Sequence, residues 1–393
     1  MLETPFDCSR PFQIIETPMS NPILFVDLYA QYLTIKDEID FVISDVIQKS
    51  SFVRGPYVEK FEQDFAEMMD RKYCVSCANG TDSLYIAMKA FGVGPADEVI
   101  VPAHSWISTS ETVTQAGAKV VFCDTDEETF TINPSSIEAK ITPNTVGIIP
   151  VHLYGQPADM DAIMAIAKKH NLWVLEDCAQ AHLARYKGQL VGTFGNAASF
   201  SFYPGKNLGA MGDAGAIVTN DHALAEKITM FARHGGLKKG DHQIEGINSR
   251  LDGLQAAILS VKLPYLSKWT ALRQGLAGRY TDLLSKLAEI TVPWVAEGRE
   301  HVWHLYVIRS DRRDNLAEFL SRNGVQTVIN YPIALPFLPA YKKFDCQPAD
   351  FPNAFRNQSR VLSLPIYPEL TDLQINRVIE LIDEFSDKEL LRD

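Results

Sequence analysis

Three segments of the chain carry side chains that could act together on one ligand. In the first, Cys77–Met88 (CANGTDSLYIAM), Gly80 allows a tight turn, and Thr81 and Asp82 fall in the first turn of a predicted helix. Free backbone N–H groups and the helix dipole make such a turn a site for phosphate. The same residue types are also ordinary helix caps, so this segment alone leaves both interpretations open.

The second segment, Leu172–His182 (LWVLEDCAQAH), runs from an apolar strand into Glu176 and Asp177. Pyridoxal phosphate needs a carboxylate against its ring nitrogen, because the opposite charge raises the pKa of that nitrogen and keeps it protonated. A carboxylate at this strand end would meet that need. An acidic residue that simply ends a strand is the competing interpretation.

The third segment, Ser199–Asn220, contains Lys206 in a loop between two apolar strands, next to the small residue Gly205. A lysine in that setting suits a Schiff-base role. A solvated loop lysine is the alternative and the commonest fate of the residue type. Because ligands of open α/β sheets bind at the carboxyl ends of the strands, the three segments together predict one site.

The elements that must position these segments are short apolar runs separated by helical stretches. Helices are predicted at Glu59–Met69 and after Gly80, where apolar residues recur at helical spacing. The predicted strands are Glu98–Val101, Lys119–Cys123, Val146–Val151, Leu172–Leu175, Ala198–Phe202 and Ala214–Val218. Runs without polar alternation indicate an α/β fold with a mostly parallel sheet, covered by helices on both faces.

The chain is predicted to divide into three parts. Residues 1–20 form an irregular arm, residues 21–265 a large α/β domain and residues 266–393 a smaller α+β domain. The elements expected in the last part are a helix over Ser267–Ile290, a strand over Trp303–Ile308, and helices over Leu316–Asn323 and Leu373–Phe385.

Composition excludes several classes of partner. A net charge of −12 over 393 residues argues against nucleic acid or an anionic membrane as the main partner. No apolar stretch is long enough to span a bilayer, and the first residues lack a signal-peptide core, so a cytoplasmic location is expected. Cys74 and Cys77 have C-x-x-C spacing, but without a second pair or a nearby His they predict buried thiols, and we expect no metal site.

The chain resembles the DegT/DnrJ/EryC1/StrS aminotransferases, a branch of the fold-type I pyridoxal-phosphate enzymes. Besides the three segments, the resemblance is carried by FVDLYAQY (Phe25–Tyr32), RGPYVEKFE (Arg54–Glu62), GINSRLDGLQAA (Gly246–Ala257), VWHLYVI (Val302–Ile308) and SLPIYPEL (Ser363–Leu370). It covers nearly the whole chain. It implies a large domain with a seven-stranded, mostly parallel sheet and a smaller C-terminal domain.

The resemblance also implies a role for each matching residue. Lys206 would hold pyridoxal phosphate as a Schiff base and later shuttle protons, and Asp177 would pair with the ring nitrogen. The other implied cofactor contacts are Gln180 at the phenolic oxygen, Trp106 stacked on the ring, Gly80, Thr81, Asp82 and Ser201 at the phosphate, and Asn248 reaching it from the partner subunit. That last contact requires a homodimer with shared active sites.

Contacts with the substrate are predicted for His182, Arg250 and Tyr331. His152 and His182 follow apolar runs or strand ends, and structural histidines are the alternative for both. Arg54, Arg185 and Arg250 are basic candidates for meeting a nucleotide diphosphate. The chain departs from the common family pattern at Pro336, where many relatives have His, and at Ile247, where Tyr is frequent. Both departures put the identity of the substrate in question.

The reaction implied by the resemblance is ping-pong transamination. L-Glutamate would give its amino group to form pyridoxamine phosphate, and a nucleotide-linked keto-deoxysugar would then take the amine, for O-antigen, lipopolysaccharide or secondary-metabolite biosynthesis. The text after Lys206 resembles enzymes that act on C3 of dTDP- or UDP-3-keto-sugars, which we favour over C4 of a nucleotide 4-keto-6-deoxysugar. Lys206 argues against the family's 3-dehydratases, in which His replaces that lysine.

Two other classes of protein remain as alternatives. A catalytically silent regulator that binds the cofactor would also belong to this family, although Lys206, Asp177 and Gln180 weigh against it. An unrelated nucleotide-binding α/β protein would bind no chromophore. No G-x-G-x-x-G opens a helix to support that class.

Overall fold

The structure is a computed structural model that describes residues 22–238 and 240–390. The segment 1–20, predicted to be an irregular arm, lies outside the described residues. Among the helices of the described part, none combines the length and the apolar character needed to cross a membrane.

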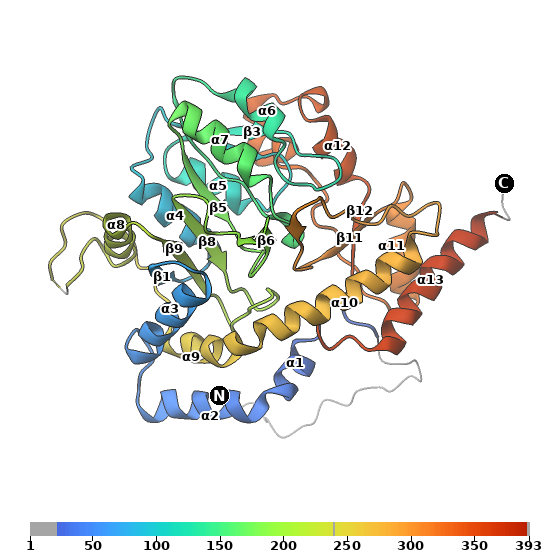
Figure 1. The fold of residues 1–393 in the computed structure, drawn as a ribbon, viewed down its shortest axis with the longest axis horizontal. Helices are drawn as coiled ribbons and strands as arrows, with labels where there is room; N and C mark the ends of the chain where they lie inside the picture. The colour runs from blue at the N-terminus through green and yellow to red at the C-terminus, as the bar shows by residue number, and fades with distance from the viewer. Residues whose placement is uncertain (1–21, 239, 391–393) are drawn as a thin grey trace, which may run out of the picture.

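A seven-stranded sheet forms the centre of the molecule, in the order β1-β9-β8-β5-β4-β2-β3 (Figure 1). Its strands are β1 (Tyr73–Cys77), β2 (Glu98–Pro102), β3 (Lys119–Cys123), β4 (Thr145–Ile148), β5 (Trp173–Asp177), β8 (Ala197–Ser201) and β9 (Gly215–Thr219). Parallel pairing joins β3, β2, β4, β5 and β8. Only β9 runs antiparallel to both of its neighbours, β8 and β1, so the prediction of a mostly parallel sheet is confirmed.

Helices cover both faces of the sheet, and successive strand residues alternate between the two layers. Val99 and Val101 of β2 belong to the core under α4, α5 and α8, whereas Ile100 belongs to the core under α7. Farther along the sheet, α3 and α9 cover the second face. The bounds are α3 (Pro56–Met68), α4 (Gly80–Ala90), α5 (Ser108–Gln115), α6 (Pro134–Ile137), α7 (Met160–His170), α8 (His222–Ala232) and α9 (Gly253–Lys262).

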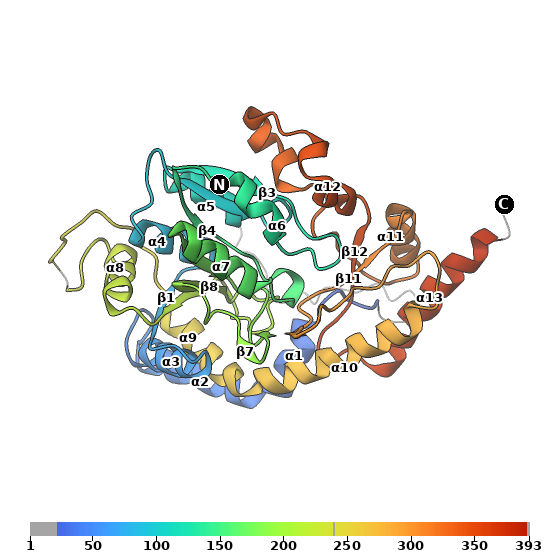
Figure 2. The same ribbon diagram turned by 45° about the horizontal axis from the view of Figure 1, so that its top comes forward.

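The first described helices lie against the second face. Helices α1 (Leu28–Thr34) and α2 (Lys36–Gln48) precede α3, and α2 contacts α9. In Figure 2, α2, α3 and α9 lie together at the bottom of the view. Helix α10 (Leu266–Leu284) runs from this layer toward α13.

The C-terminal part has its own core around a two-stranded antiparallel sheet. Its elements are α10, β11 (Tyr306–Arg309), α11 (Arg313–Arg322), β12 (Val361–Leu364) and α13 (Asp372–Leu390). Helix α12 (Pro352–Gln358) lies between α11 and β12 in the chain, but its Ala354 packs in the core of the large sheet. A small three-stranded sheet, β6 (Arg185–Tyr186), β7 (Gln189–Leu190) and β10 (Arg299–Glu300), joins this part to the large sheet's side. Helix α10 begins beside the proposed boundary at residue 265, but Ile23 also packs in the C-terminal core. The division therefore stays a proposal.

Candidate active site

A cavity of about 640 Å³ lies at the carboxyl edge of the sheet, where β5 ends at Asp177 and β8 ends at Ser201. The structure brings together here many of the residues predicted to contact cofactor or substrate: Gly80, Thr81, Trp106, Asp177, Gln180, Ser201, Lys206 and Tyr331. The three segments singled out in the sequence thus meet at one place, as the strand-end argument predicts.

Lys206 is held in a turn after β8 by a backbone bond from its N–H to the carbonyl of Tyr203. Burial around the amine lowers the pKa of Lys206 to about 8, although the nearby carboxylate of Asp177 opposes that shift. Among the described residues, the amine makes no hydrogen bond. A lysine amine that is partly neutral near pH 7 and has no other bonding partner can attack a carbonyl carbon.

The pKa of Lys206 predicts how the protein captures pyridoxal phosphate. The neutral amine is the attacking form, so the rate of covalent capture by the apoprotein should rise about tenfold per pH unit below pH 8 and level off above it. Stopped-flow absorbance between pH 6 and 10 measures this. A rate that keeps rising to pH 10, as for an ordinary lysine, would contradict the assignment.

Asp177 is a buried carboxylate aimed by two hydrogen bonds. Its Oδ2 accepts from Thr109 Oγ1 at 3.0 Å, and its Oδ1 accepts from the backbone N–H of Ala179 at 3.1 Å. Burial raises the pKa of Asp177, while these bonds and Lys206 oppose the shift. A protonated ring nitrogen in the cavity would supply the cation that this carboxylate lacks, so Asp177 fits the predicted cofactor.

The start of α4 forms a cradle suited to phosphate. The side chain of Asn79 caps the helix by accepting a hydrogen bond from the N–H of Asp82. The N–H groups of Gly80 and Thr81, also in the first turn, make no hydrogen bond among the described residues. Both residues line the cavity beside Ser201. A Cβ atom at Gly80 would stand 2.6 Å from Ser201 Cβ, so only glycine permits this close approach. Free amides at a helix N-terminus facing a cavity fit the phosphate of the cofactor.

Gly80→Ala should weaken retention of the cofactor. The added methyl would push α4 and Ser201 apart, and we expect the protein to lose pyridoxal phosphate at least ~10-fold more readily, the cost of about one charge-assisted hydrogen bond. Equilibrium dialysis followed by absorbance measures this. Gly94→Ala, where a Cβ meets open space, is the matched control. Equal retention by the two variants would show that the close approach is unimportant.

Gln180 and Tyr331 form the cavity wall together. Gln180 accepts from the N–H of Tyr154 at 2.6 Å and donates to the Tyr331 hydroxyl at 3.0 Å. The backbone N–H of Tyr331 donates to His104 Nε2 at 3.0 Å. Trp106 lines the mouth of the cavity with its ring 5.6 Å from that of Tyr331, and 57% of it is exposed. The positions of Gln180 and Trp106 are compatible with their predicted cofactor contacts, which stay predictions.

This cavity is not lined by four of the predicted contacts, Asp82, His182, Asn248 and Arg250, or by the basic candidates Arg54 and Arg185. The carboxylate of Asp82 accepts a hydrogen bond from Ser249 Oγ at 2.6 Å, and its contact with the phosphate stays a prediction. His182 is fully buried against the rings of Phe200 and Phe202, and its contact with the substrate stays a prediction. Asn248 and Arg250 also lie outside this cavity. The contact predicted for Asn248 is with the phosphate in the site of a partner subunit.

The sequence reasoning missed Thr109, which orients Asp177. It lies only three residues after Trp106 in VPAHSWIST, but no spacing or charge pattern marks it. It also missed Arg273, His304 and Asn330, which line the cavity from the C-terminal part of the chain. Their proximity to Lys206 follows from tertiary packing, which local sequence does not encode.

Directly behind Asp177, Glu176 and His152 form a buried pair with an Nε2–Oε2 distance of 3.1 Å. Glu176 also accepts from the backbone N–H groups of Gly192, Phe194 and Gly195. His152 Nδ1 accepts from the N–H of Ala158, so Nε2 carries the proton. Although Cys178 is close enough to complete a metal-ligand set, these bonds already occupy the His and Glu ligand atoms. The cluster fixes the end of β5.

Glu176→Gln should destabilise the protein. The amide nitrogen of Gln would face backbone donors that need an acceptor, and leaving a buried donor unsatisfied typically costs about 1–3 kcal/mol. Urea unfolding followed by circular dichroism measures the free energy of unfolding. Glu226→Gln, in an exposed pair with His222, is the control and should change it by under ~0.5 kcal/mol. Equal stabilities of the two variants would contradict this role.

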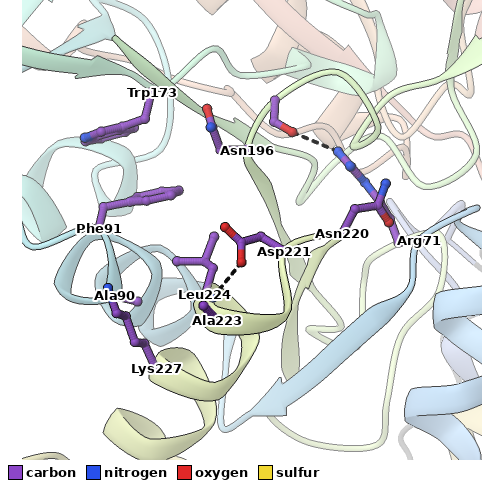
Figure 3. A pocket seen from close by; sticks show the side chains of 11 residues that line it. Arg71, Ala90, Phe91, Trp173, Asn196, Asn220, Asp221, Ala223, Leu224 and Lys227 are labelled. Carbon is purple, nitrogen blue, oxygen red and sulfur yellow. Dashed lines mark hydrogen bonds between the residues drawn. The ribbon is translucent and has the colours of Figure 1, made fainter. Parts of the chain in front are cut away.

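A second hollow, of about 540 Å³, lies at the opposite edge of the sheet (Figure 3). It is lined by Trp173, the first residue of β5, and by Asn196, which precedes β8. Figure 3 shows the rings of Phe91 and Trp173 lying parallel, with centroids 4.8 Å apart. None of the predicted site residues lines this hollow, so the chemistry belongs to the carboxyl edge.

Comparison with known proteins finds relatives along nearly the whole chain. The chain is 46% identical to a "Pleiotropic regulatory protein" of Geobacillus stearothermophilus, over 93% of this chain and 99% of the relative. It is 41% identical to the dTDP-3-amino-3,4,6-trideoxy-alpha-D-glucose transaminase of Streptomyces venezuelae, over 95% and 98%. It is 44% identical to the UDP-2-acetamido-2-deoxy-3-oxo-D-glucuronate aminotransferase of Pseudomonas aeruginosa, over 90% and 97%.

A solved structure agrees with these matches. The crystal structure of S. venezuelae DesV, in complex with a ketimine intermediate, superimposes with a TM-score of 0.91 at 41% identity, covering 93% of this chain and 99% of that one.

The fold and the lysine–aspartate site define a pyridoxal-phosphate-dependent aminotransferase. Residues 33–383 match the model of the DegT/DnrJ/EryC1/StrS aminotransferase family, and the chain belongs to that family. Two of the relatives reported above are named as aminotransferases of nucleotide sugars.

Proposed function

We propose that this enzyme transfers an amino group from L-glutamate to C3 of a nucleotide-linked 3-keto-deoxysugar, in a pathway of amino-sugar biosynthesis. The observation that carries the proposal is the pair of close relatives named for C3 chemistry, one on a dTDP sugar and one on a UDP sugar. The cavity with Lys206 and Asp177 supports turnover rather than silent binding. A regulatory role is the alternative function, because the Geobacillus relative is named a pleiotropic regulatory protein.

In the proposed transamination, the residues of this chain would bind the cofactor and move protons. Bound pyridoxal phosphate supplies an aldehyde carbon that carries the amino group and a ring that takes up the electron pair released at the reacting carbon. The amides of Gly80 and Thr81 would hold the phosphate, and Asp177 would keep a proton on the ring nitrogen. Lys206, once released from the cofactor, would move a proton between the reacting carbon and the cofactor carbon.

A homodimer with shared sites is part of the proposal. Exposed apolar side chains are frequent between residues 28 and 53, including Tyr29, Phe41 and Ile47, and burying them against a second copy would be favourable. The positive charges of Arg233 and Arg250 help to lower the pKa of Arg54. Arg250 is two residues after Asn248 in the sequence. A cluster of like charges of this kind would be stabilised by an anionic group in the partner's site.

The proposed function is tested in the reverse direction, with stable amino-sugar nucleotides and 2-oxoglutarate. Matched dTDP and UDP sugars carrying the amine at C3 or C4 are supplied, and formation of glutamate is measured. We expect 3-amino sugars to react at least ~100-fold faster than their 4-amino isomers, because a misplaced amine loses the near-attack geometry. Faster reaction of the 4-amino sugars would overturn the C3 assignment. Bound cofactor without reaction of any sugar would favour the regulatory alternative.

A further inference from the structure

Arg273 is a buried cation that neither the predicted site nor the mechanism above uses. It lies in the middle of α10, the helix that runs from the large sheet toward the C-terminal core. Only 4% of the residue is exposed, yet it lines the same cavity as Lys206 and His304.

One nitrogen of the guanidinium is anchored to the protein backbone. Arg273 Nη1 donates to the carbonyl oxygens of Ile366 at 2.7 Å, Trp303 at 3.2 Å and His304 at 3.5 Å. These acceptors come from two separate segments, so the plane of the guanidinium is fixed.

The other edge of the guanidinium has no partner within the part of the chain that the structure describes. Among the described residues, Nε and Nη2 make no hydrogen bond, and neither belongs to the fully enclosed polar atoms that lack one. In a residue that lines the cavity, these two nitrogens are therefore accessible from it. Together they form the side-on fork that matches the two oxygens of a carboxylate.

The charge of Arg273 also has no ion-pair partner among the residues that the structure describes. Burial lowers the pKa of Arg273 to about 10, and the only acidic group that opposes this shift is Glu369, with which it forms no ion pair. The half-buried imidazole of His304 lines the same cavity, and the charges of Lys206 and Arg273 both help to lower its pKa. A buried cation without an anion is costly, and a bound anion would relieve that cost.

We propose that the Nε–Nη2 edge of Arg273 binds a carboxylate of the substrate. This inference rests on the proposed function, because the α-carboxylate of an amino-acid donor is attached to the same carbon as the amine that must reach the cofactor. A carboxylate on the sugar, as in a uronic acid, is a second source of the same chemistry.

The direct test is binding of glutarate, a dicarboxylate that cannot be transaminated, to the cofactor-loaded enzyme by calorimetry. Arg273→Lys keeps the charge but removes the fork, and we expect its affinity for glutarate to fall about 10- to 100-fold. Arg279→Lys is the matched control, because Arg279 lies on the same helix and pairs with Asp372. Unchanged affinity in a folded Arg273→Lys protein would overturn the proposal.

The two sources of carboxylate are separated by half-reactions followed through the cofactor spectrum. If the donor carboxylate is bound, Arg273→Lys slows the reaction with L-glutamate but not the reverse reaction with a neutral amino-sugar nucleotide. If a sugar carboxylate is bound, only the amino-uronate reaction slows. Equal loss in all three reactions would mean that Arg273 only clamps the backbone. If the wild type converts no donor at all, the proposed function fails, while the glutarate measurement still tests Arg273.

Discussion

Lys206→Ala is expected to abolish covalent attachment of pyridoxal phosphate and to reduce transamination by at least ~10³-fold, because the chain loses both its nucleophile and its proton carrier. Borohydride reduction followed by peptide mass spectrometry measures attachment, and glutamate half-reactions measure turnover. The cradle formed by Gly80 and Thr81 stays intact in this variant. Non-covalent binding of the cofactor should therefore persist, which separates loss of chemistry from loss of the site.

Lys262 provides the matched control for this prediction. Lys262 is buried, whereas Lys206 is half-buried, and burial lowers the pKa of Lys262 to about 8 as well. Its amine, however, donates to the carbonyl of Gly209 at 2.8 Å and does not line the cavity. Lys262→Met should keep the covalent cofactor. A cofactor label on Lys262 in the wild type, or on any residue in the Lys206→Ala protein, would contradict the assignment.

Asp177→Asn should give the second largest loss, about 10³-fold in the glutamate half-reaction. The ring nitrogen would lose a carboxylate at hydrogen-bonding distance, an interaction of about 4 kcal/mol in a partly polar protein environment, where each 1.4 kcal/mol is a factor of ten. The amide cannot hold a proton on the nitrogen by charge, so the ring would no longer take up electrons effectively. Single-turnover absorbance with saturating L-glutamate measures this rate.

Thr109→Val provides a graded comparison. It removes one hydrogen bond to Asp177 Oδ2 but leaves the charge in place, so the rate of the glutamate half-reaction is expected to fall about tenfold.

Replacing the cofactor by an analogue with a permanently charged ring nitrogen should restore much of the Asp177→Asn rate. A lack of rescue, or a larger loss in Thr109→Val than in Asp177→Asn, would show that Asp177 does not act through the ring nitrogen.

Much of the fold and the centre of the site could be predicted from the sequence, because the signals are local. Short apolar runs predicted six of the seven central strands to within three residues at each end. The site was predicted from Gly80, Asp177 and Lys206, which lie at or just after the ends of strands. The reversed direction of β9 was not predicted, since an apolar run does not carry its orientation. Strand β1 was not predicted either, although Cys74 and Cys77 were expected to be buried, as they are.

The rest of the site depends on contacts between distant segments. Thr109 reaches Asp177 across 68 positions of sequence, and Arg273 reaches Ile366 across 93. His182 follows the same strand end as Asp177, but its side chain turns into the core against Phe200. Proximity in sequence to Asp177 therefore does not fix where the side chain of His182 lies, because neighbouring side chains leave a strand end in different directions.

The most direct test of the account is the absorbance spectrum of the purified protein with pyridoxal phosphate, before and after L-glutamate. A visible band from the lysine-bound cofactor that glutamate bleaches and 2-oxoglutarate restores is the predicted result, and Lys206→Ala should show no such band. A wild-type protein that binds the cofactor but whose band no amino acid changes would contradict the central claim that this site transfers amino groups.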